Sequence, residues 1–458
     1  MSISRRSFLK RAGILGASGL IMPTIVPASV FGKNAPSNKI NVGMIGVGRI
    51  SRGHDFPGVA GYEYAKVMAA CDVDRNRLED GKKLINEFYA KKTGKSYNGV
   101  TTYENYMDLL TNKDIDAVVI STPDHWHAKQ TIDAVYAGKD VYLQKPASLT
   151  VEEGRLMSNA VNKTGRIFQV GSQQRSWKQF REAVEFVRNG RIGKLISCEV
   201  RLPGDPAGGR TEEMPVPEYL NYDLWLGPTP YVYYTEDRIQ PQKGYGRPGW
   251  LRCEQFGSGM ITGWGTHHFD TVHWAMNLEY SGPVEISGTA EFPTSGLWDV
   301  HGDFQTELLY PNGVKVYGLT ENNTDKPNGI LFTGTEGWIF VSRGDQQVTS
   351  SDPNQPKSRV KALDASDPKI LSPLGEGSWR APVSDNHHVN WLEAVKNRTQ
   401  PLTSAEIAHR SCTVCLLQHI AMKLKRKLYW DPLKEKFKND DDANKMLSRT
   451  YRAGYELL

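Results

Sequence analysis

The chain has 458 residues, which is enough for about two or three domains of roughly 150 residues each. Hydrophobic residues make up 39%, charged residues 23% and aromatic residues 10%, and these proportions exclude a disordered, a collagen-like or a multi-span membrane protein. The formal net charge is +5, and Arg5, Arg6, Lys10 and Arg11 supply four of these charges. The rest of the chain is nearly neutral, so we expect no nucleic-acid partner. The five cysteines are too scattered for a disulfide framework.

Residues 1–32 have the pattern of an export signal. The segment 4–10 (SRRSFLK) precedes a mostly apolar stretch from about residue 12 to residue 30, and no acidic residue occurs before Asp55. Paired arginines followed by Phe-Leu-Lys are similar to a twin-arginine signal, which exports proteins that are already folded. We expect cleavage near residues 28–33 and a periplasmic protein with no permanent membrane span, because glycine, serine and two prolines make the apolar stretch a poor anchor. An ordinary signal and an uncleaved anchor are the alternatives.

A dinucleotide-binding domain of the Rossmann type is predicted over residues 38–165. The apolar strand 40–47 runs into the turn 46–51 (GVGRIS). Gly46 permits the tight bend, Gly48 lets the backbone approach a pyrophosphate, and Ser51 is small enough for the next helix to pack on the strand. The N–H groups at the start of that helix would point at the phosphate charge.

The identity of the dinucleotide is indicated by a second strand, 65–73. Asp72 stands near the end of this strand, where a carboxylate can accept both hydroxyl groups of the adenosine ribose. This position favours NAD over NADP. Arg75 follows closely and could hold a 2′-phosphate instead, so NADP is the less favoured alternative.

Helices and strands alternate through the rest of this domain. The alternation predicts a parallel, doubly wound sheet with ligands at the carboxyl ends of its strands. The predicted helices are 75–92, 103–110, 127–137 and 151–163, and the further predicted strands are 116–121, 140–143 and 166–170.

The second domain is predicted over residues 166–458, as an α/β domain with an open, mainly antiparallel sheet. Several of its strands alternate apolar and polar residues and are joined by turns such as 311–313 (PNG). We expect helices that begin near Ser176 and His387 to cover one face of this sheet, and self-association to bury the exposed parts of the sheet. The predicted strands are 194–202, 284–292, 303–309, 314–319, 330–333 and 338–341.

Lys145 is the first candidate for chemistry. It follows the strand 140–143 within Gln144-Lys145-Pro146, at the end of the sheet where ligands bind. There a lysine can donate to a hydroxyl or carbonyl oxygen near a nicotinamide. Hydride transfer from an alcohol also requires removal of the hydroxyl proton, so a base must lie close by.

A histidine pair is the second candidate. His267 and His268 lie in a predicted helix, where adjacent side chains point about 100° apart, so one of them is a candidate acid or base and the other packs. Asp270 is on the same side of the helix as His267 and could orient it. A metal site is the alternative, but no Cys/His spacing supports a tetrahedral site, so we expect no metal. That alternative would use His267, His268, His273 and His301.

Together these segments resemble the Gfo/Idh/MocA oxidoreductase family, over nearly the whole chain after the signal. The resemblance is specific because the motifs fall in the family's order and spacing. It implies a Rossmann domain followed by an α/β domain with an open sheet, NAD or NADP as cofactor, and sugars or cyclitols as substrates. The motifs are 46–51, 121–127 (STPDHWH), 144–146 (QKP), 171–175 (GSQQR), the segment Gly265-x-His267-x-x-Asp270, and 334–337 (GTEG).

The resemblance also implies the site residues. Lys145 is similar in position to the family's catalytic lysine, and His267 to its catalytic histidine. The expected cofactor contacts are Gly46, Gly48, Arg49, Ile50, Ser51, Asp72, Ser121, Thr122, Pro123, His125, Trp126, His127, Gln144 and Lys145. The expected contacts to a small-molecule carbohydrate substrate are Gln173, Arg175, Trp250, Arg252 and His268.

The sequence departs from the family pattern at two positions. Gln144 replaces the usual glutamate; its amide can still hydrogen-bond the cofactor ribose but adds no charge. Gly263 stands where inositol-dehydrogenase-like members carry an aspartate, four residues before the histidine. Proton handling is therefore expected to rest on Lys145 and His267, with His268 in reserve.

The resemblance and the export signal together predict an exported NAD-dependent oxidoreductase that converts a ring hydroxyl of a sugar or glycoside to a ketone. Free NAD is scarce outside the cytoplasm, so we expect tightly bound NAD that is recycled by reducing a second carbonyl compound. The alternative is an NAD-dependent glycoside hydrolase, similar to the NAD-dependent α-N-acetylgalactosaminidases, which oxidise C3 transiently and eliminate the aglycone. The longer histidine-rich signature of that group is absent from this sequence. A non-catalytic sugar-binding relative is the third alternative.

Overall fold

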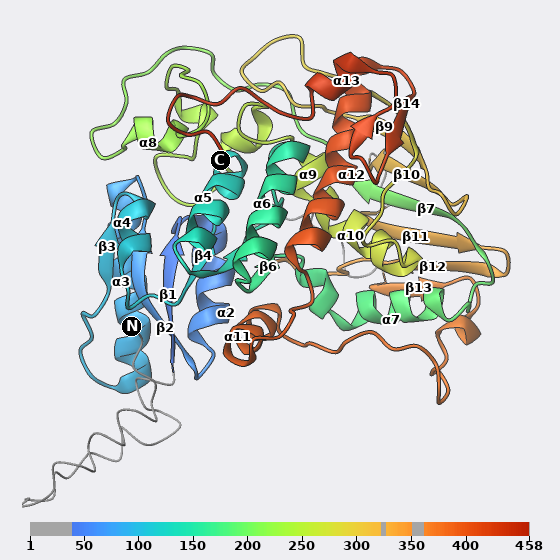
Figure 1. The fold of residues 1–458 in the computed structure, drawn as a ribbon, viewed down its shortest axis with the longest axis horizontal. Coiled ribbons are helices and arrows are strands. Elements are labelled where there is room, and N and C mark those ends of the chain that lie inside the picture. Colours follow the sequence, from blue (N-terminus) through green and yellow to red (C-terminus); the bar gives the residue numbers. More distant parts are fainter. Residues whose placement is uncertain (1–38, 322–326, 350–360, 458) are drawn as a thin grey trace, which may run out of the picture. The chain divides into compact units, whose positions relative to one another are not determined.

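Two β-sheets, with helices between and around them, organise the structure (Figure 1). The structure is a computed structural model, and it describes residues 39–321, 327–349 and 361–457. The predicted export signal, residues 1–32, lies outside the described residues. Residues 40–458 form one unit that contains both sheets.

The first sheet is parallel throughout, with strand order β3-β2-β1-β4-β5-β6. All four residues of β4 are buried; Val118 and Ile120 lie in one hydrophobic cluster, Ala117 and Val119 in another, so helices cover both faces. The strand order reverses between β1 and β4, the point where such sheets bind ligands. The strands are β1 (Ile40–Ile45), β2 (Ala65–Cys71), β3 (Thr101–Tyr103), β4 (Ala117–Ile120), β5 (Asp140–Leu143) and β6 (Phe168–Val170).

One face of the first sheet is covered by a helix from the C-terminal part of the chain. Trp391 is fully buried in a hydrophobic cluster with Val42 and Met44 of β1, so α11 packs on the first sheet together with α2 and α3. The prediction that the helix from His387 covers the second sheet is therefore wrong. The helices named here are α2 (Phe56–Ala60), α3 (Arg75–Thr93) and α11 (His387–Asn397); the other face carries α4 (Tyr106–Thr111), α5 (Asp124–Tyr136) and α6 (Val151–Thr164).

Local sequence determines where these helices begin. At α6 the Thr150 hydroxyl accepts the N–H of Glu153 (3.2 Å), and the Glu153 carboxylate accepts the N–H of Thr150 (3.1 Å), which is a reciprocal capping box. At α3 the Asp74 carboxylate accepts the N–H groups of Asn76 and Arg77. Both starts lie next to strand ends of the first sheet, so the caps also fix the loops that line the site.

The second sheet is antiparallel except for one parallel pair, β7 with β10, and has the order β13-β12-β11-β7-β10-β9-β8-β14-β15. The predicted fold class, a Rossmann domain followed by an α/β domain with an open and mainly antiparallel sheet, is confirmed. The six predicted strands correspond to β7 (Leu195–Leu202), β8 (Glu285–Ala290), β9 (Phe304–Leu309), β10 (Lys315–Thr320), β11 (Gly329–Gly334) and β12 (Gly337–Val341). The sequence did not indicate β13 (Leu363–Ala365), β14 (Leu428–Asp431) and β15 (Lys436–Phe437).

Helices cover one face of the second sheet. Cys198, Val200 and Leu202 point from β7 into the core beneath α7 (Lys178–Arg188), α10 (Gly265–Met276) and α12 (Ala405–Leu424). Helix α12 also packs on α6, so a continuous hydrophobic core joins the two sheets (Figure 1). No helix in the described ranges is long and apolar enough to cross a membrane.

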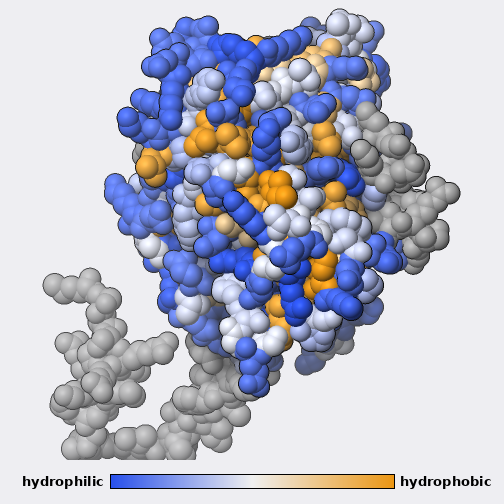
Figure 2. All heavy atoms as spheres, turned by 90° about the vertical axis from the view of Figure 1, so that its right-hand side faces the viewer, coloured by the Kyte–Doolittle hydropathy of each residue, from blue (hydrophilic) through white to orange (hydrophobic). Residues whose placement is uncertain are grey.

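The other face of the second sheet is mixed in character. Arg201 and Glu199 form an ion pair on β7 (2.8 Å), and Lys315 pairs with Glu307 between β10 and β9 (2.8 Å). Figure 2 shows the side of the molecule that is at the right in Figure 1; separate apolar patches lie there among hydrophilic residues. Self-association stays a prediction.

The C-terminal segment returns across the first domain. After β14, β15 and α13 (Asp441–Lys445), the chain ends beside α5 (Figure 1). Arg449 donates to the Glu153 carboxylate (2.6 Å) and to the carbonyl oxygen of His125 (2.8 Å), and Arg452 pairs with Asp223 (2.7 Å). These contacts tie the end of the chain to the helices that border the site.

Candidate active site

A single cavity brings most of the predicted site residues together. The first domain contributes the carboxyl ends of β1, β2, β4 and β5, and the second contributes segment 240–251, α9 (Met260–Gly263), α10 and Arg343. The predicted residues that line it are Gly46, Gly48, Arg49, Ile50, Asp72, Ser121, Thr122, Pro123, Trp126, His127, Gln144, Lys145, Gln173, Trp250 and His267.

The glycine-rich turn forms one end of this cavity. Gly46 has φ +82°, and a Cβ there would lie 2.9 Å from the backbone of Ser121, so only glycine lets β1 and β4 approach so closely. A Cβ on Gly48 would meet nothing within 4 Å, so the backbone borders open space where a pyrophosphate could lie against it. Ser51 is buried behind the turn and does not line the cavity.

Asp72 lies beside this turn. Its carboxylate accepts the N–H of Val47 (3.0 Å) and the N–H of Asp74 (3.0 Å), and burial raises its pKa to about 6 against these hydrogen bonds. Arg75, the residue that could hold a 2′-phosphate, is exposed, donates to the carbonyl oxygen of Glu218 and does not line the cavity. This arrangement favours the unphosphorylated ribose of NAD.

Lys145 and His267 meet at the opposite, reactive end. The Lys145 ammonium group donates to the carbonyl oxygen of Gly263 (2.8 Å), the last residue of α9, while His267 stands on α10. His267 is 3% exposed; burial, and then the charges of Arg343 and Lys145, hold its pKa well below the usual range. The ring is therefore neutral near pH 7 and has a lone pair with which to accept a proton.

Some buried polar atoms at this cavity have no hydrogen-bond partner within the described ranges of the chain. Among them are Nδ1 of His267 and Oε1 of Gln173, and both side chains line the cavity. A buried polar group without a partner is costly, so these atoms indicate a ligand that supplies hydrogen bonds. A polyhydroxylated molecule is such a ligand.

Asp124 also lies at the reactive end, and sequence reasoning missed it as a site residue. It begins α5, is 2% exposed and lines the cavity. Burial raises the pKa of this carboxyl to about 8, although the nearby Lys145 charge favours the ionised form. The group is thus poised to exchange a proton near neutral pH. The absence of an aspartate at Gly263 was the signal that a carboxyl could come from another element.

His127 links the strand ends around Lys145. Its Nδ1 lies 2.6 Å from the carbonyl oxygen of Pro146, and its Nε2 lies 2.9 Å from that of Thr122. Burial lowers the pKa of His127 to about 4, so the ring is neutral and donates to one carbonyl oxygen at a time. It therefore joins α5 to the ends of β4 and β5.

Arg175, predicted to bind substrate, lies outside the cavity lining. Its guanidinium group is buried and donates to both oxygens of Asp270 (2.7 and 2.8 Å) and to Glu279 (2.6 Å). Asp270 accepts from Arg175 and Ser411 instead of from His267, so the prediction that it orients His267 is wrong. Helical spacing put the two residues on one side but could not reveal the stronger partner.

Three further predicted residues lie outside the lining because each is held elsewhere. His268 lies between Gln174 (3.3 Å) and Asn328 (2.9 Å), beneath the second sheet. His125 lies 2.9 Å from the carbonyl oxygen of Trp225. Arg252 lies 4.4 Å over the ring of Trp298 and 3.7 Å from Asp205.

Arg343 is a cavity residue that no motif indicated. It lies just after β12, and its guanidinium group stacks on the rings of Trp264 (4.2 Å) and Trp177 (5.2 Å). Trp264 itself lines the cavity beside His267. Because these residues meet only through the packing of the second sheet against α7 and α10, their spacing in the sequence carries no signal.

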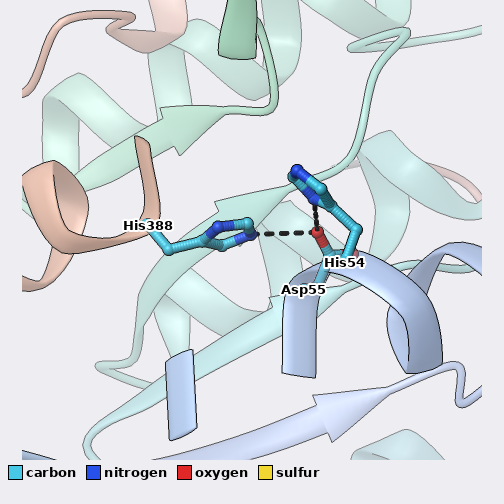
Figure 3. Close-up of side chains that lie close together, drawn as sticks. All are labelled: His54, Asp55 and His388. Atoms are coloured by element: carbon cyan, nitrogen blue, oxygen red, sulfur yellow. Dashed lines mark hydrogen bonds and ion pairs between the residues drawn. The ribbon is translucent and has the colours of Figure 1, made fainter. Parts of the chain in front are cut away.

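One group of possible metal ligands occurs among the described residues: His54, Asp55 and His388, with ligand atoms within 4.8 Å of one another (Figure 3). The histidines weighed for a metal site from the sequence do not form such a group in the described part of the chain.

Two family models match the chain. One, described as oxidoreductase family, NAD-binding Rossmann fold, matches residues 40–172, and the other, described as oxidoreductase family, C-terminal alpha/beta domain, matches residues 207–457. The chain belongs to the Gfo/Idh/MocA oxidoreductase family. The predicted cofactor, NAD, is confirmed at the level of this NAD-binding domain. The turn at Gly46, the open space at Gly48 and the carboxylate of Asp72 all fit it.

Curated relatives share part of the chain. A glycosyl hydrolase family 109 protein of Shewanella pealeana is 31% identical over 215 residues, which are 43% of this chain and 46% of the relative. Glycosyl hydrolase family 109 protein 1 of Shewanella sp. strain MR-4 is 30% identical over 216 residues, 43% of this chain and 45% of the relative. These matches span about half the length of the relatives.

Solved structures share the fold over most of the chain. The WlbA dehydrogenase of Bordetella pertussis, in complex with NADH and UDP-GlcNAcA, has a TM-score of 0.60 at 16% identity and covers 86% of this chain and 99% of its own. The aldose-aldose oxidoreductase of Caulobacter crescentus, complexed with glycerol, has a TM-score of 0.58 at 18% identity, covering 85% and 99%. Similarity at these identities establishes the fold alone.

Proposed function

We propose that this chain is an exported NAD-dependent oxidoreductase that converts a ring hydroxyl of a sugar or glycoside to a ketone. The observation that carries the proposal is the meeting of Lys145, His267 and Asp124 at one end of a cavity whose other end is the dinucleotide turn. NAD, when bound, supplies the hydride acceptor for the carbon that bears the hydroxyl. The chain's own residues must then bind the alcohol and take its proton.

The proton route begins at the hydroxyl oxygen. Lys145, held by the carbonyl oxygen of Gly263, donates a hydrogen bond to this oxygen and steadies it. His267, neutral because it is buried, accepts the proton as the C–H hydride leaves. Asp124, with a pKa of about 8, is the next group able to exchange that proton. One hydride and one proton thus leave the alcohol, and a ketone remains.

A segment of the second domain supports tight retention of NAD. The ring of Tyr245 lies between the guanidinium groups of Arg52 (4.5 Å) and Arg77 (4.8 Å), and its hydroxyl donates to Asp80 (2.9 Å). Neighbouring residues of this segment, among them Gln240 and others up to Leu251, line the cavity. A segment fixed in this way across the helix after the dinucleotide turn would hinder release of NAD. Retained NAD, recycled by reduction of a second carbonyl compound, suits a protein outside the cytoplasm.

Export and self-association are further parts of the proposal. The paired arginines Arg5 and Arg6 and the apolar stretch after them support the twin-arginine route and a periplasmic location. The open face of the second sheet supports self-association, since exposed sheets are often covered by a second copy.

The second candidate function is glycoside hydrolysis, which the glycosyl hydrolase family 109 relatives favour. The first step is the same oxidation, at C3. The ketone acidifies the C2–H bond, loss of that proton expels the aglycone from C1 with its bonding electrons, and water adds at C1 while a proton returns to C2. Return of the hydride to C3 closes a cycle with no net oxidation, so no carbonyl acceptor is consumed.

The decisive experiment uses mature protein purified without added nucleotide. Denaturation is expected to release near-stoichiometric NAD, which is assayed in the supernatant by absorbance and mass. Glycosides are then incubated with and without a carbonyl acceptor: ketone formation only with the acceptor supports the oxidoreductase, and cleavage without it supports the hydrolase. A protein that holds no NAD and does not bind it would overturn both candidates.

Tyr245 is the residue of this segment whose replacement tests retention of NAD. Tyr245→Ala is expected to lower the NAD that copurifies several-fold, whereas Tyr280→Ala, at a tyrosine that is 64% exposed, serves as the matched control. Equal NAD content in the two variants would remove the role given to segment 240–251.

A further inference from the structure

A fully buried carboxylate, Asp55, lies directly behind the site and accepts four hydrogen bonds. Gln144 Nε2 and Ser121 Oγ donate to its two oxygens, each at 2.7 Å. The ring nitrogens His388 Nε2 (3.0 Å) and His54 Nδ1 (3.2 Å) approach the same oxygen as Gln144. Figure 3 shows the two imidazole rings pointing at Asp55 from different elements.

These side chains come from four parts of the chain that converge at Asp55. Asp55 ends η3 (Ser51–Asp55), the helical turn that follows the dinucleotide turn. Ser121 and Gln144 follow β4 and β5, and His388 is the second residue of α11. The His388 ring stacks on Tyr142 at 4.6 Å, and a Cβ on Gly58 would lie 2.3 Å from its Nδ1. The arrangement is therefore closely packed as well as hydrogen-bonded.

Asp55 carries its charge at all physiological pH values. Burial opposes ionisation, but hydrogen bonds from His388 and His54 outweigh it and hold the pKa of Asp55 well below its usual range. Burial lowers the pKa of His388, so that ring is neutral and acts as an N–H donor. Asp55 can only accept hydrogen bonds in this state.

This charge dictates how Gln144 is oriented. Because the carboxylate only accepts, Gln144 must turn Nε2 toward Asp55, and Oε1 then accepts the N–H of Lys145 (3.3 Å) on the side of the cavity. A glutamate at this position, the family's usual residue, would bring two carboxylates within about the 2.7 Å that now separates Gln144 from Asp55. Asp55 and Gln144 thus form a matched pair.

We propose that Asp55 is a positioning residue for bound NAD, which acts by fixing the amide of Gln144 so that Oε1 is presented to a ribose hydroxyl at the reactive end. The family's usual glutamate would place a negative charge at position 144. In this protein the negative charge belongs to Asp55, which lies behind Gln144 on the side away from the cavity. This inference rests on NAD binding by the family and not on the sugar chemistry. Its test therefore reads NAD binding.

The test replaces Gln144 by the family's usual residue. In Gln144→Glu, two carboxylates can share one proton at pH 5.5 and keep their hydrogen bond, but both are ionised and repel at pH 8. We expect NAD to dissociate from this variant at least about tenfold faster at pH 8 than at pH 5.5, after correction for any difference between these pH values in the parent protein. Dissociation is followed by the change in the protein's tryptophan fluorescence after dilution. Gln144→Met, which has no charge, is expected to speed dissociation equally at both pH values.

The comparison with the parent isolates the added carboxylate. The titratable groups that surround the pair are His54, His388, Tyr142 and Lys145, and all are common to parent and variant. Gln169→Glu, on β6, is the matched control because it adds a buried carboxylate that does not contact Asp55. Near-UV circular dichroism establishes that each variant is folded.

A double variant tests the proposal by removing the carboxylate of Asp55. Asp55→Asn combined with Gln144→Glu leaves one carboxylate at the pair, so the pH dependence of NAD dissociation is expected to disappear. The proposal is overturned if NAD dissociates from Gln144→Glu at the same rate as from the parent at both pH values. It is likewise overturned if NAD dissociation from the double variant still depends on pH as it does in Gln144→Glu. It is also overturned if purified protein holds one equivalent of metal whose removal by a chelator changes NAD dissociation, since the cluster would then be a metal site.

Discussion

The two ends of the cavity are assembled in different ways. The dinucleotide end comes from one short stretch of sequence: Gly46 and Gly48 lie in the turn after β1, and Asp72 directly follows β2. The reactive end collects side chains from distant segments, of which Lys145 follows β5 and His267 lies on α10 of the other domain. Nucleotide binding is thus a local property of one supersecondary unit, whereas the chemistry exists only when the two domains pack correctly.

The largest effect is expected from Lys145→Ala, which alters the reactive end of the cavity and leaves the dinucleotide end intact. Lys145→Ala removes the group that binds the substrate oxygen, so turnover is expected to fall by about 10³-fold while the NAD content of the purified protein stays the same. Turnover is measured with saturating substrate, and NAD after denaturation. Lys129→Ala, at a lysine paired with Asp133 on α5, is the control. Turnover within tenfold of the parent would exclude the proposed role of Lys145.

Arg175 tests whether a predicted substrate residue is structural. Arg175→Met leaves the buried Asp270 and the partly buried Glu279 without their cation, which is expected to lower the free energy of unfolding by about 3–5 kcal/mol. The turnover of the folded fraction is expected to stay near that of the parent. Denaturant unfolding and activity at low temperature measure the two quantities. The control is Arg191→Met, at an arginine whose guanidinium group donates to the carbonyl oxygens of Ser372 and Pro373. A raised KM with unchanged stability would return Arg175 to the substrate site.

Sequence reasoning succeeded where function depends on neighbouring residues. The spacing of Gly46, Gly48 and Asp72 implied their places in the fold, because a phosphate turn and the next strand end are close in the chain. Sequence reasoning failed where one side chain has two competing hydrogen-bond partners. Helical spacing put Asp270 beside His267, but the guanidinium group of Arg175 offers two hydrogen bonds and a charge, and takes the carboxylate instead.

The sequence also did not predict how the two domains pack together. The apolar pattern of α11 is the same whichever sheet it covers, and only the fit of Trp391 against β1 decides. Arg343 has no motif because its place depends on two tryptophans from other elements. These are contacts between distant segments, for which a single sequence carries no local signal.

Asp124 tests whether the reactive end needs a carboxyl group. Asp124→Asn removes a group able to exchange the proton, so turnover is expected to fall by about 10²-fold at pH 7. The folded pKa of about 8 lies above the unfolded value of 3.8, so the folded state holds a proton that the unfolded state releases, and the parent loses stability as pH rises from about 4 to 8. The variant is therefore expected to gain thermal stability relative to the parent over this window, with the largest gain near pH 8. Equal pH dependence of the two melting temperatures would exclude an Asp124 carboxyl that is protonated when folded.

The smallest effect belongs to the dinucleotide end. Asp72→Asn removes the charged acceptor for the adenosine ribose, so NAD is expected to bind about tenfold more weakly, while kcat at saturating NAD is unchanged. Burial raises the pKa of Asp72 to about 6, so the charged form is lost as pH falls from 7 to 5, and NAD affinity of the parent should fall over that window while that of the variant stays flat. Because Arg75 is engaged by the carbonyl oxygen of Glu218 and lies outside the cavity lining, the variant should not gain affinity for NADP. A variant that lowered kcat as well would mean that the two ends are coupled, and that the local character of nucleotide binding does not hold in this protein.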